Sequence, residues 1–513
     1  MLYDLAIPAQ LTAALLPDLL LMGGAMCLML LAAWKRDSAH HQRTVGYASL
    51  GLLTAVFGTV AWMALRHDAT NTGGVIAVDG FRFLVDLVVL LGAAGTIALA
   101  IEHNDRDGIT QAESHVLVLF AASGMMILAA ARDLMVVFLG IEIMSVAVYV
   151  LAGLDRRSPR SAEASLKYFL LGAFATGFLL YGMALIYGAT GETQLNRIGN
   201  AVGSLQLAKD PMFLVGCGLL LVGLGFKVAA APFHMWAPDV YDGAPTPITA
   251  FMAASVKAAA FAAFLRIWFE GFYFGWAGWA NATWWLAVVT MVVGNVVALQ
   301  QKNIKRMLAY SSIVHSGYLL VAVTAASAFA STAFTFYVLA YTLATFGAFA
   351  VVATMQPAGT TDARIADYEG LWHVRPWLAT AMGVYLLALL GFPVFGGIGF
   401  FAKWYLVQAA LASPSRLSAL AVILVVTSVI SAGYYLQVVR AMFMQPRPAD
   451  APAPPAAGVL TRTVMVVTAA LILALGLFPS QLVAITKDNG FRPYPFSPAL
   501  QMGLPQMDPL ANK

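Results

Sequence analysis

Residues Leu220–Arg266 read LLVGLGFKVAAAPFHMWAPDVYDGAPTPITAFMAASVKAAAFAAFLR, two long apolar runs joined by a short segment rich in Pro and Gly. Each run has one lysine near its middle, Lys227 in the first and Lys257 in the second. A charge at the centre of a membrane helix costs at least about 2.5–3.5 kcal/mol. We therefore expect both lysines to have a function, and we infer that they carry protons.

The composition of the chain indicates that its solvent is lipid. Of 513 residues, 60% are hydrophobic and only 11% are charged, whereas soluble domains have about 25% charged residues. In water such a chain would expose large apolar patches. Its two cysteines, Cys27 and Cys217, lie in apolar runs and predict no disulfide framework. No Lys or Arg precedes the first apolar run, so we expect a retained helix and not a cleaved signal peptide.

Hydropathy in windows of about 19 residues predicts an all-α polytopic membrane protein with about fourteen transmembrane helices. The fourth and fifth spans are separated only by Arg132 and Asp133, and the ninth and tenth only by QQKNIKR. The approximate centres of the spans are residues 25, 55, 91, 123, 144, 177, 223, 258, 290, 316, 342, 391, 430 and 470.

Two spans have breaks in matching places. The seventh carries Pro232 between Lys227 and His234, and the twelfth has GFPVFGGIGFF at its middle. Broken helices in lipid usually line a protein-buried or wet cavity, because their freed backbone groups need partners. A simple proline kink is the alternative for the seventh span.

The breaks are five spans apart, and an odd spacing predicts two inverted five-helix repeats, spans 4–8 and 9–13. The predicted division of the chain is the first three helices in 1–110, the first repeat in 111–270 and the second repeat in 271–445. Residues 446–513 then hold a Pro-rich linker, the last span and a C-terminal tail.

Basic residues between the spans predict the orientation. One set of alternate loops holds sixteen: Lys35, Arg36, Arg43, Arg106, Arg156, Arg157, Arg160, Lys167, Lys302, Lys305, Arg306, Arg364, Arg375, Arg440, Arg447 and Arg462. The other side holds ten: Arg66, Arg82, Arg132, Arg197, Lys209, Arg266, Arg416, Lys487, Arg492 and Lys513. The richer side should face the cytoplasm, which puts both termini on the periplasmic side of a bacterial inner membrane.

Motifs of soluble chemistry are missing from the sequence. No Gly-rich nucleotide loop follows a strand, no Cys or His cluster has metal-ligand spacing, and no nucleophile elbow is present. We therefore expect no cofactor and no metal in this chain. The chemistry should lie in ionisable groups at membrane depth.

Glu142 lies in the almost wholly apolar run VVFLGIEIMSVAVYVL, so its side chain should face the protein interior. Lys227 is its natural partner. A buried lysine holds its proton more tightly beside a carboxylate than without one, so a pair that opens and closes can load and release a proton. A structural ion pair without a transport role is the alternative.

Further titratable groups follow along the chain. His234 is seven residues after Lys227, two turns along one face if the helix were continuous, and its ordinary pKa suits a relay. A hydrogen-bonded core histidine is the other interpretation. Lys257 lies on the eighth span, His315 in RMLAYSSIVHSGYLL of the tenth, and Lys403 in GFFAKWYL of the twelfth.

Three stretches, LGFKVAAAPFHMWAPDVYDGAPTPITAF, KRMLAYSSIVHSGYLL and GIEIMS, resemble the antiporter-like membrane subunits of respiratory complex I. The stretch PDVYDGAPTPITAFMAASVK is similar to the N-type subunit of bacterial NADH:quinone oxidoreductase, the counterpart of mitochondrial subunit 2. The resemblance covers residues from about 110 to 440. One span and a tail after Pro446 fit the N type and not the L type, which continues into a lateral helix.

The resemblance implies roles for five residues in proton transfer. Glu142 and Lys227 match the family's paired glutamate and lysine, and His234 matches a central-axis histidine. Lys257 matches the lysine of the eighth span, and Lys403 the lysine leading to the outer half-channel. Flavin and iron–sulfur clusters are expected in other subunits, and the implied neighbours are the M-, A-, J- and K-type subunits. The quinone is not bound by this chain, and no nucleic acid is expected.

Two other functions stay open. A subunit of a cation/proton antiporter would use the same fold and the same lysines, and co-purification with iron–sulfur subunits would distinguish it. A purely structural membrane scaffold would tolerate neutral residues at Lys227 and Lys403 without loss of pumping.

Overall fold

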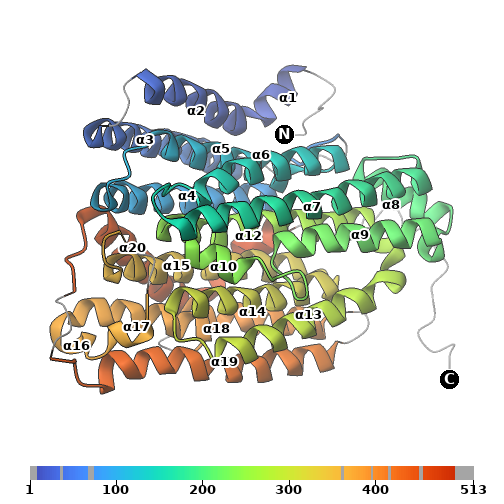
Figure 1. Cartoon of the computed structure of the whole chain (residues 1–513). Helices are drawn as coiled ribbons and strands as arrows, with labels where there is room; N and C mark the ends of the chain where they lie inside the picture. Colours follow the sequence, from blue (N-terminus) through green and yellow to red (C-terminus); the bar gives the residue numbers. More distant parts are fainter. Residues whose placement is uncertain are drawn as a thin grey trace.

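The computed structural model of the chain is a bundle of helices whose axes run roughly side by side (Figure 1). It describes residues 8–34, 38–66, 74–359, 363–393, 397–413, 417–449 and 454–490. These residues form no strand beyond isolated β-bridges. They form 12 helices long and apolar enough to cross a membrane. The seventh and twelfth spans are built from shorter helices, so the predicted polytopic helical fold is confirmed.

The first three spans form one edge of the bundle (Figure 1). The helices of this part are α1 (Pro8–Ala14), α2 (Leu16–Trp34), α3 (Ala39–Arg66) and α4 (Gly80–Asp107). Helix α4 begins after Asp79, whose side chain accepts a hydrogen bond from the Arg82 amide. It ends at Gly108, whose φ of 66° is left-handed. Both ends of α4 are therefore fixed by local sequence.

The next five spans surround the stretch Leu220–Arg266. Their helices are α5 (Glu113–Ala130), α6 (Leu134–Ala152), α7 (Pro159–Thr190), α8 (Leu195–Ser204), α9 (Pro211–Lys227), α10 (Ala237–Gly243), α11 (Thr246–Phe251) and α12 (Lys257–Arg266). A π-helical turn, Met252–Val256, joins α11 to α12, and a second, Ile267–Gly271, follows α12. Short 3-10 turns lie at Leu207–Lys209 and Tyr273–Gly275.

The remaining spans complete the bundle. Their helices are α13 (Trp276–Ala298), α14 (Ile304–Ala325), α15 (Ala330–Met355), α16 (Leu371–Val374), α17 (Pro376–Leu390), α18 (Ile398–Leu411), α19 (Ser418–Met444), α20 (Val459–Leu477) and α21 (Pro479–Asp488). A 3-10 turn lies at Ile365–Tyr368. Part of the Pro-rich linker, 450–453, and the tail from 491 lie outside the described residues.

Both predicted helix breaks are present. Helix α9 ends at Lys227 and α10 begins at Ala237, while residues 228–236 leave the helix altogether. The simple kink at Pro232 is therefore wrong. Helix α17 ends at Leu390, where Gly391 takes a left-handed φ of 74°, and α18 begins at Ile398. Glycine permits the reversal at Gly391 because it has no Cβ.

Two β-bridges occupy matching places in the predicted repeats. Asp133, at the start of α6, is bridged to Gln194 after α7, and Asn303, at the start of α14, is bridged to Arg364 after α15. Helix α8 follows the first bridge and α16 the second, and they lie at opposite ends of the bundle in Figure 1. This correspondence supports two units with inverted orientation.

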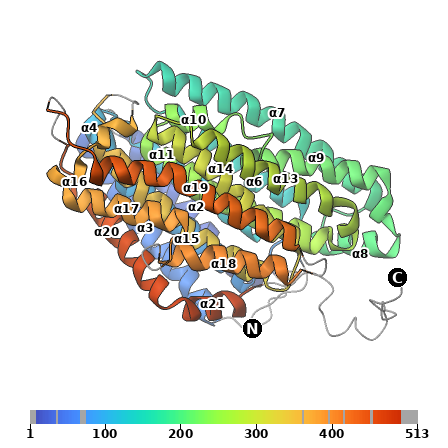
Figure 2. The same ribbon diagram turned by 90° about the horizontal axis from the view of Figure 1, so that it is seen from below.

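The buried centre of the molecule is formed by the run Thr246–Gly271 together with α14 and α15, of which nearly every residue is buried. In contrast, α7 is mostly exposed and runs along one edge of the molecule in Figure 2. The lysine at the start of α12 therefore lies deep within protein and not against lipid.

Candidate functional site

Lys227 is the last residue of α9, and its side chain is 3% exposed. The Nζ atom donates hydrogen bonds to Ser145 Oγ at 2.6 Å and to Tyr149 OH at 3.1 Å. It also lies 5.2 Å from the centre of the Tyr149 ring. Ser145 and Tyr149 are four residues apart on α6 and share one helix face. Neutral oxygen atoms, and not a carboxylate, thus hold this ammonium group.

Glu142 lies three residues before Ser145 on α6 and is half-buried. It accepts a hydrogen bond from Thr176 Oγ1 of α7 at 3.0 Å. Among the ion pairs of the described residues, none joins Glu142 and Lys227 within 4.0 Å. The structure therefore describes a separated arrangement, and the paired arrangement stays a prediction.

The segment between α9 and α10 is held by hydrogen bonds to α9, α13 and α14. Trp236 Nε1 donates to Phe226 O at 3.0 Å, and Ser316 Oγ of α14 donates to Val228 O at 2.5 Å. The Ala231 amide donates to Thr290 Oγ1 of α13 at 3.0 Å. The bonds to Val228 O and from the Ala231 amide supply partners for backbone groups of the non-helical segment.

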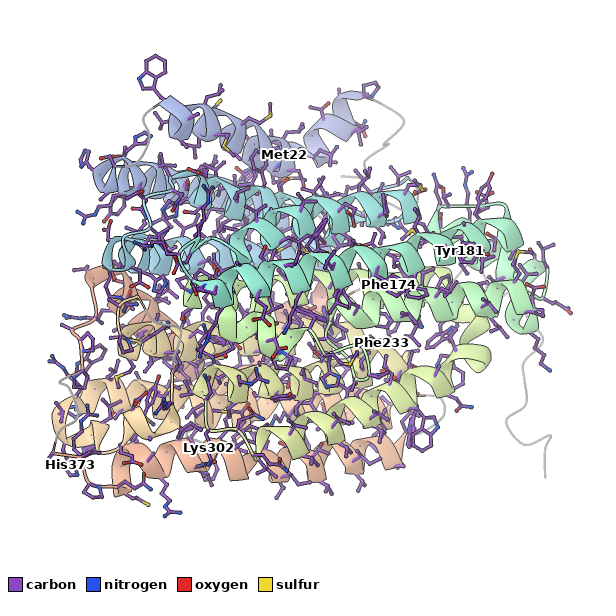
Figure 3. The ribbon with its side chains drawn as sticks, viewed as in Figure 1. Met22, Phe174, Tyr181, Phe233, Lys302 and His373 are labelled. Carbon is purple, nitrogen blue, oxygen red and sulfur yellow. The ribbon has the colours of Figure 1, made fainter. Side chains whose placement is uncertain are left out.

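His234 lies in this non-helical segment and directly follows Phe233, the residue of this segment that Figure 3 labels. The helix face that His234 would share with Lys227 in a continuous helix does not form, because the chain leaves the helix at residue 228 and passes through Pro232. His234 is half-buried, and its Nδ1 atom has no hydrogen-bond partner among the described residues. Its predicted part in proton transfer has no contact with Lys227 to support it.

Lys257 is the first residue of α12 and directly follows the π-helical turn Met252–Val256. Its side chain is 2% exposed, and Nζ donates to the Ser312 carbonyl of α14 at 2.6 Å and to Ser312 Oγ at 2.5 Å. Tyr341 OH of α15 donates to the same Ser312 Oγ at 2.9 Å. Single π-helical turns of this kind are frequent at functional sites.

His315 is buried one turn beyond Ser312 on α14. Its Nδ1 atom is 2.5 Å from Tyr337 OH, and its Nε2 atom is 3.1 Å from Tyr435 OH. Tyr435 OH shares a further hydrogen bond with Ser311 Oγ. Both ring nitrogens thus contact hydroxyl groups, which can donate and accept protons.

Lys403 lies on α18 and is 8% exposed. Its Nζ atom donates to Leu390 O and to Ser428 Oγ of α19, both at 2.7 Å, and lies 4.9 Å from the centre of the Tyr318 ring. Leu390 is the last residue of α17. Lys403 therefore satisfies one of the carbonyl groups left unpaired at the second helix break.

Two cavities adjoin Lys403. A small one is lined by Lys403 and His315 together with Tyr337 and Tyr341. A larger one, of about 360 Å³, is lined by Lys403 and by apolar side chains that include Trp404. Lys403 thus lies between the buried histidine and a cavity at the side of the bundle.

Helix α14 links these groups. Ser316 contacts the break after Lys227, Ser312 holds Lys257, and His315 shares a cavity with Lys403. Sequence reasoning found the charged groups and missed the hydroxyl groups between them. A signal existed, because Tyr337 and Tyr341 are four residues apart inside a span, whereas membrane tyrosines are enriched at the interfaces.

Three of the basic residues that were expected between the spans are buried in the structure. Lys305 is fully buried, and its Nζ atom donates to the carbonyl groups of Asp242 and Ala244 at 2.8 Å each, at the end of α10. Arg82 and Arg266 are also fully buried. Lys305 belongs to the predicted cytoplasmic side, and Arg82 and Arg266 belong to the predicted periplasmic side. The excess of basic residues on the predicted cytoplasmic side therefore remains when these three are left out.

A polar cavity of about 170 Å³ lies beside α10 and is lined in part by Arg160 and Asp242. Asp239 also lines this cavity and accepts hydrogen bonds from Arg306 at 2.8 Å and from Lys167 at 3.0 Å. Burial raises the pKa of Asp239, but the hydrogen bonds from Arg306 and Lys167 outweigh burial and bring the pKa below its ordinary value. The carboxylate is therefore held between two cationic side chains in a polar cavity close to the first helix break.

Comparison with known proteins gives consistent results. A family described as NADH:quinone oxidoreductase/Mrp antiporter, TM, matches residues 131–431. NADH-quinone oxidoreductase subunit N of Gemmatimonas aurantiaca is 52% identical over 482 residues, 92% of each chain. A chain of respiratory complex I from Thermus thermophilus with bound aureothin is 37% identical, with a TM-score of 0.77 over 92% of this chain and 100% of that one. A chain of the Mrp complex from a Dietzia species, 23% identical with a TM-score of 0.81 over 95% of this chain and 99% of that one, shares the fold.

Proposed function

The chain belongs to the subunit N family of NADH-quinone oxidoreductase, and on that premise we propose that it translocates protons across the membrane in response to electron transfer from NADH to quinone. One observation carries the proposal. Lys227, Lys257 and Lys403 are all buried, and each is held by neutral oxygen atoms. A buried ammonium group without a counter-ion costs free energy, and release of its proton removes that cost.

We assign proton transfer to Glu142, Lys227, His234, Lys257 and Lys403. Glu142 modulates Lys227 by approaching or leaving it, and Ser312 and His315 connect Lys257 to the cavity beside Lys403. Lys403 leads to the outer side. The polar cavity at Asp239 suits entry from the opposite side, because charged side chains line it at the end of α10.

Replacement of Ser312 by alanine is expected to lower the number of protons pumped per NADH oxidised by about tenfold. A hydrogen bond to a charged group contributes about 1.5–3 kcal/mol, and this change removes the bond from Lys257 Nζ to Ser312 Oγ. Thr324→Ala on the same helix is the matched control, because Thr324 Oγ1 bonds only to Leu320 O within its own helix. Equal effects of the two changes would argue against a relay through Ser312.

We expect no redox centre in this chain, since its sequence has neither ligand clusters nor nucleotide loops. Within the described residues no group of three or more His, Cys, Asp or Glu side chains is placed to hold a metal ion. Iron and flavin analysis of the isolated subunit should therefore find only trace amounts. Stoichiometric iron in the purified chain would contradict the proposal that flavin and iron–sulfur clusters reside in other subunits.

Other membrane subunits of the complex are the expected partners. Glu142 is half-buried on a helix whose neighbouring residues Leu139 and Val146 are exposed, and Phe174 and Tyr181 of α7 are also exposed (Figure 3). A carboxylate at membrane depth is too costly to leave against lipid, so a protein subunit should cover this face. We propose an M-type subunit on one side of the chain and A-, J- and K-type subunits on the other.

We propose that both termini face the periplasm, and α7 offers a direct test. Arg157 and Arg197 are exposed beyond its two ends. In a background with Cys27 and Cys217 replaced by serine, an impermeant thiol reagent added from outside should label a cysteine at position 197 and not one at position 157. The opposite labelling pattern would reverse the orientation.

Participation in an antiporter complex is the alternative, since the Mrp chain shares the fold. Affinity purification of the tagged chain from native membranes distinguishes the two. Recovery of iron–sulfur subunits with NADH-oxidising activity is the expected result, and their absence from an otherwise intact complex would favour the antiporter.

A further inference from the structure

A buried arginine lies in the N-terminal helices, outside both five-helix units. Arg82 of α4 is fully buried, and its Nη1 atom donates to the carbonyl groups of Ala14 and Ala77 at 3.1 Å each. Its Nη2 atom donates to Asp18 Oδ2 of α2, and its Nε atom to Asp86 Oδ2 at 3.3 Å. One guanidinium group therefore serves two carboxylates.

The charges of this site do not balance. Asp18 is 2% exposed and Asp86 fully buried, and within the described residues neither Asp18 Oδ1 nor Asp86 Oδ1 accepts a hydrogen bond. Two ionised carboxylates around one arginine would leave one negative charge in a site without water-exposed surface. Like charges that share a buried site cannot both stay ionised at ordinary pH.

Among the described residues, the neighbouring charges do not supply the missing positive charge. Asp79 binds Arg266 at 2.8 and 3.0 Å, and Glu270 binds Arg266 at 2.9 Å and Arg132 at 2.7 Å. These two carboxylates and two guanidinium groups balance one another. The groups that act electrostatically on Asp86 are Arg82, Asp18 and Asp79, and two of those three are acidic.

We propose that Asp18 and Asp86 together bind one proton, so that a carboxylic acid lies beside an ionised carboxylate–arginine pair at neutral pH. The proton resides on Asp86, because the 3.3 Å contact between Arg82 Nε and Asp86 Oδ2 is too long for a strong hydrogen bond to an ionised carboxylate. A metal cation is disfavoured, since the guanidinium group would repel it and the two free oxygens are far fewer than the six to eight that Ca²⁺ takes.

The proton also has a consequence for packing. Asp18 lies near the start of α2, which is mostly exposed and otherwise packs on α3 and α5. Loss of the proton at alkaline pH would place two negative charges between α2 and α4 and weaken their contact. The site thus binds α2 to the bundle in a protonation-dependent way, independently of the proposed transport role.

Infrared spectroscopy of the purified intact complex tests the proposal. At neutral pH, the wild-type spectrum should contain the carbonyl band of one protonated carboxylic acid that disappears in Asp86→Asn. It should also disappear in Asp18→Asn, because Asp86 then becomes the only counter-ion of Arg82. Asp79→Asn is the matched control and should retain the band, since Asp79 is ionised beside Arg266.

Three results would overturn the proposal. The first is a band unchanged in both Asp86→Asn and Asp18→Asn. The second is a failure of Asp86→Asn to assemble where Asp79→Asn assembles, because asparagine is a neutral isostere of the protonated acid. The third is a band that appears in the wild type only after sodium is removed, which would assign the site to a metal cation.

Discussion

Replacing Lys227 by alanine is expected to lower the protons pumped per NADH oxidised by at least about tenfold, the change that about 1.4 kcal/mol corresponds to. Lys227 is the ammonium group at the first helix break, and its loss removes the charged hydrogen-bond donor from Ser145 and Tyr149 of α6. The measurement compares proton pumping with NADH oxidation by quinone in the same membranes. Assembly is checked by the amount of complex recovered.

The double change with Glu142→Gln tests whether the two residues form a switch. At about 4 Å and an effective dielectric constant near 20, opposite charges interact by roughly 4 kcal/mol. That value is an upper figure, because Glu142 is half-buried and is hydrogen-bonded to Thr176 and not to Lys227 in this structure. Each single change should lower pumping, and the double change should lower it less than the product of the two.

Strictly additive effects in a complex that assembles normally would remove the switch from the mechanism. Lys227→Arg is a further control, because arginine keeps the charge and does not release a proton. If the Lys227→Arg variant pumps protons as well as the wild type does, Lys227 acts only as a fixed charge.

The breaks and the lysines could be predicted from the sequence because both are local signals. Pro232 cannot continue a helix, Gly391 permits a left-handed turn, and a lysine in an apolar run is visible in any hydropathy window. The hydroxyl groups of α14 and α15 could not be identified in the same way. Ser312 matters only because α12 presents Lys257 to it, and that depends on the packing of three helices.

Two failures of sequence reasoning have the same origin. Helical spacing aligns His234 with Lys227 only if the helix continues, and α9 ends at residue 227. The position of Lys305 between two apolar runs predicts a charge in a loop, but its side chain is buried against the end of α10. In both cases the local sequence pattern is present, but the tertiary arrangement decides the environment of the side chain.

Replacing Lys403 by alanine is expected to lower pumping by at least about tenfold while most of the complex still assembles. The alanine leaves the Leu390 carbonyl without its 2.7 Å bond, but Ser428 Oγ lies 3.4 Å from the same carbonyl and can replace part of that bond. The cost to stability should therefore stay below the range of about 1–3 kcal/mol for a fully unpaired buried group.

Substitutions of different chemistry separate transport from structure at Lys403. Lys403→Met keeps a long apolar side chain beside Trp404 and the cavity of about 360 Å³ but removes the charge, and Lys403→Arg keeps the charge. If Lys403 loads and releases a proton, both variants should pump poorly, because methionine cannot bind a proton and arginine does not release one. Normal pumping by the arginine variant would reduce Lys403 to a fixed positive charge at the second break. Loss of the whole complex from the membrane in the methionine variant would assign the lysine a structural role, because the hydrogen bond to Leu390 would then hold the two halves of the span together and the bond to Ser428 would hold α18 to α19.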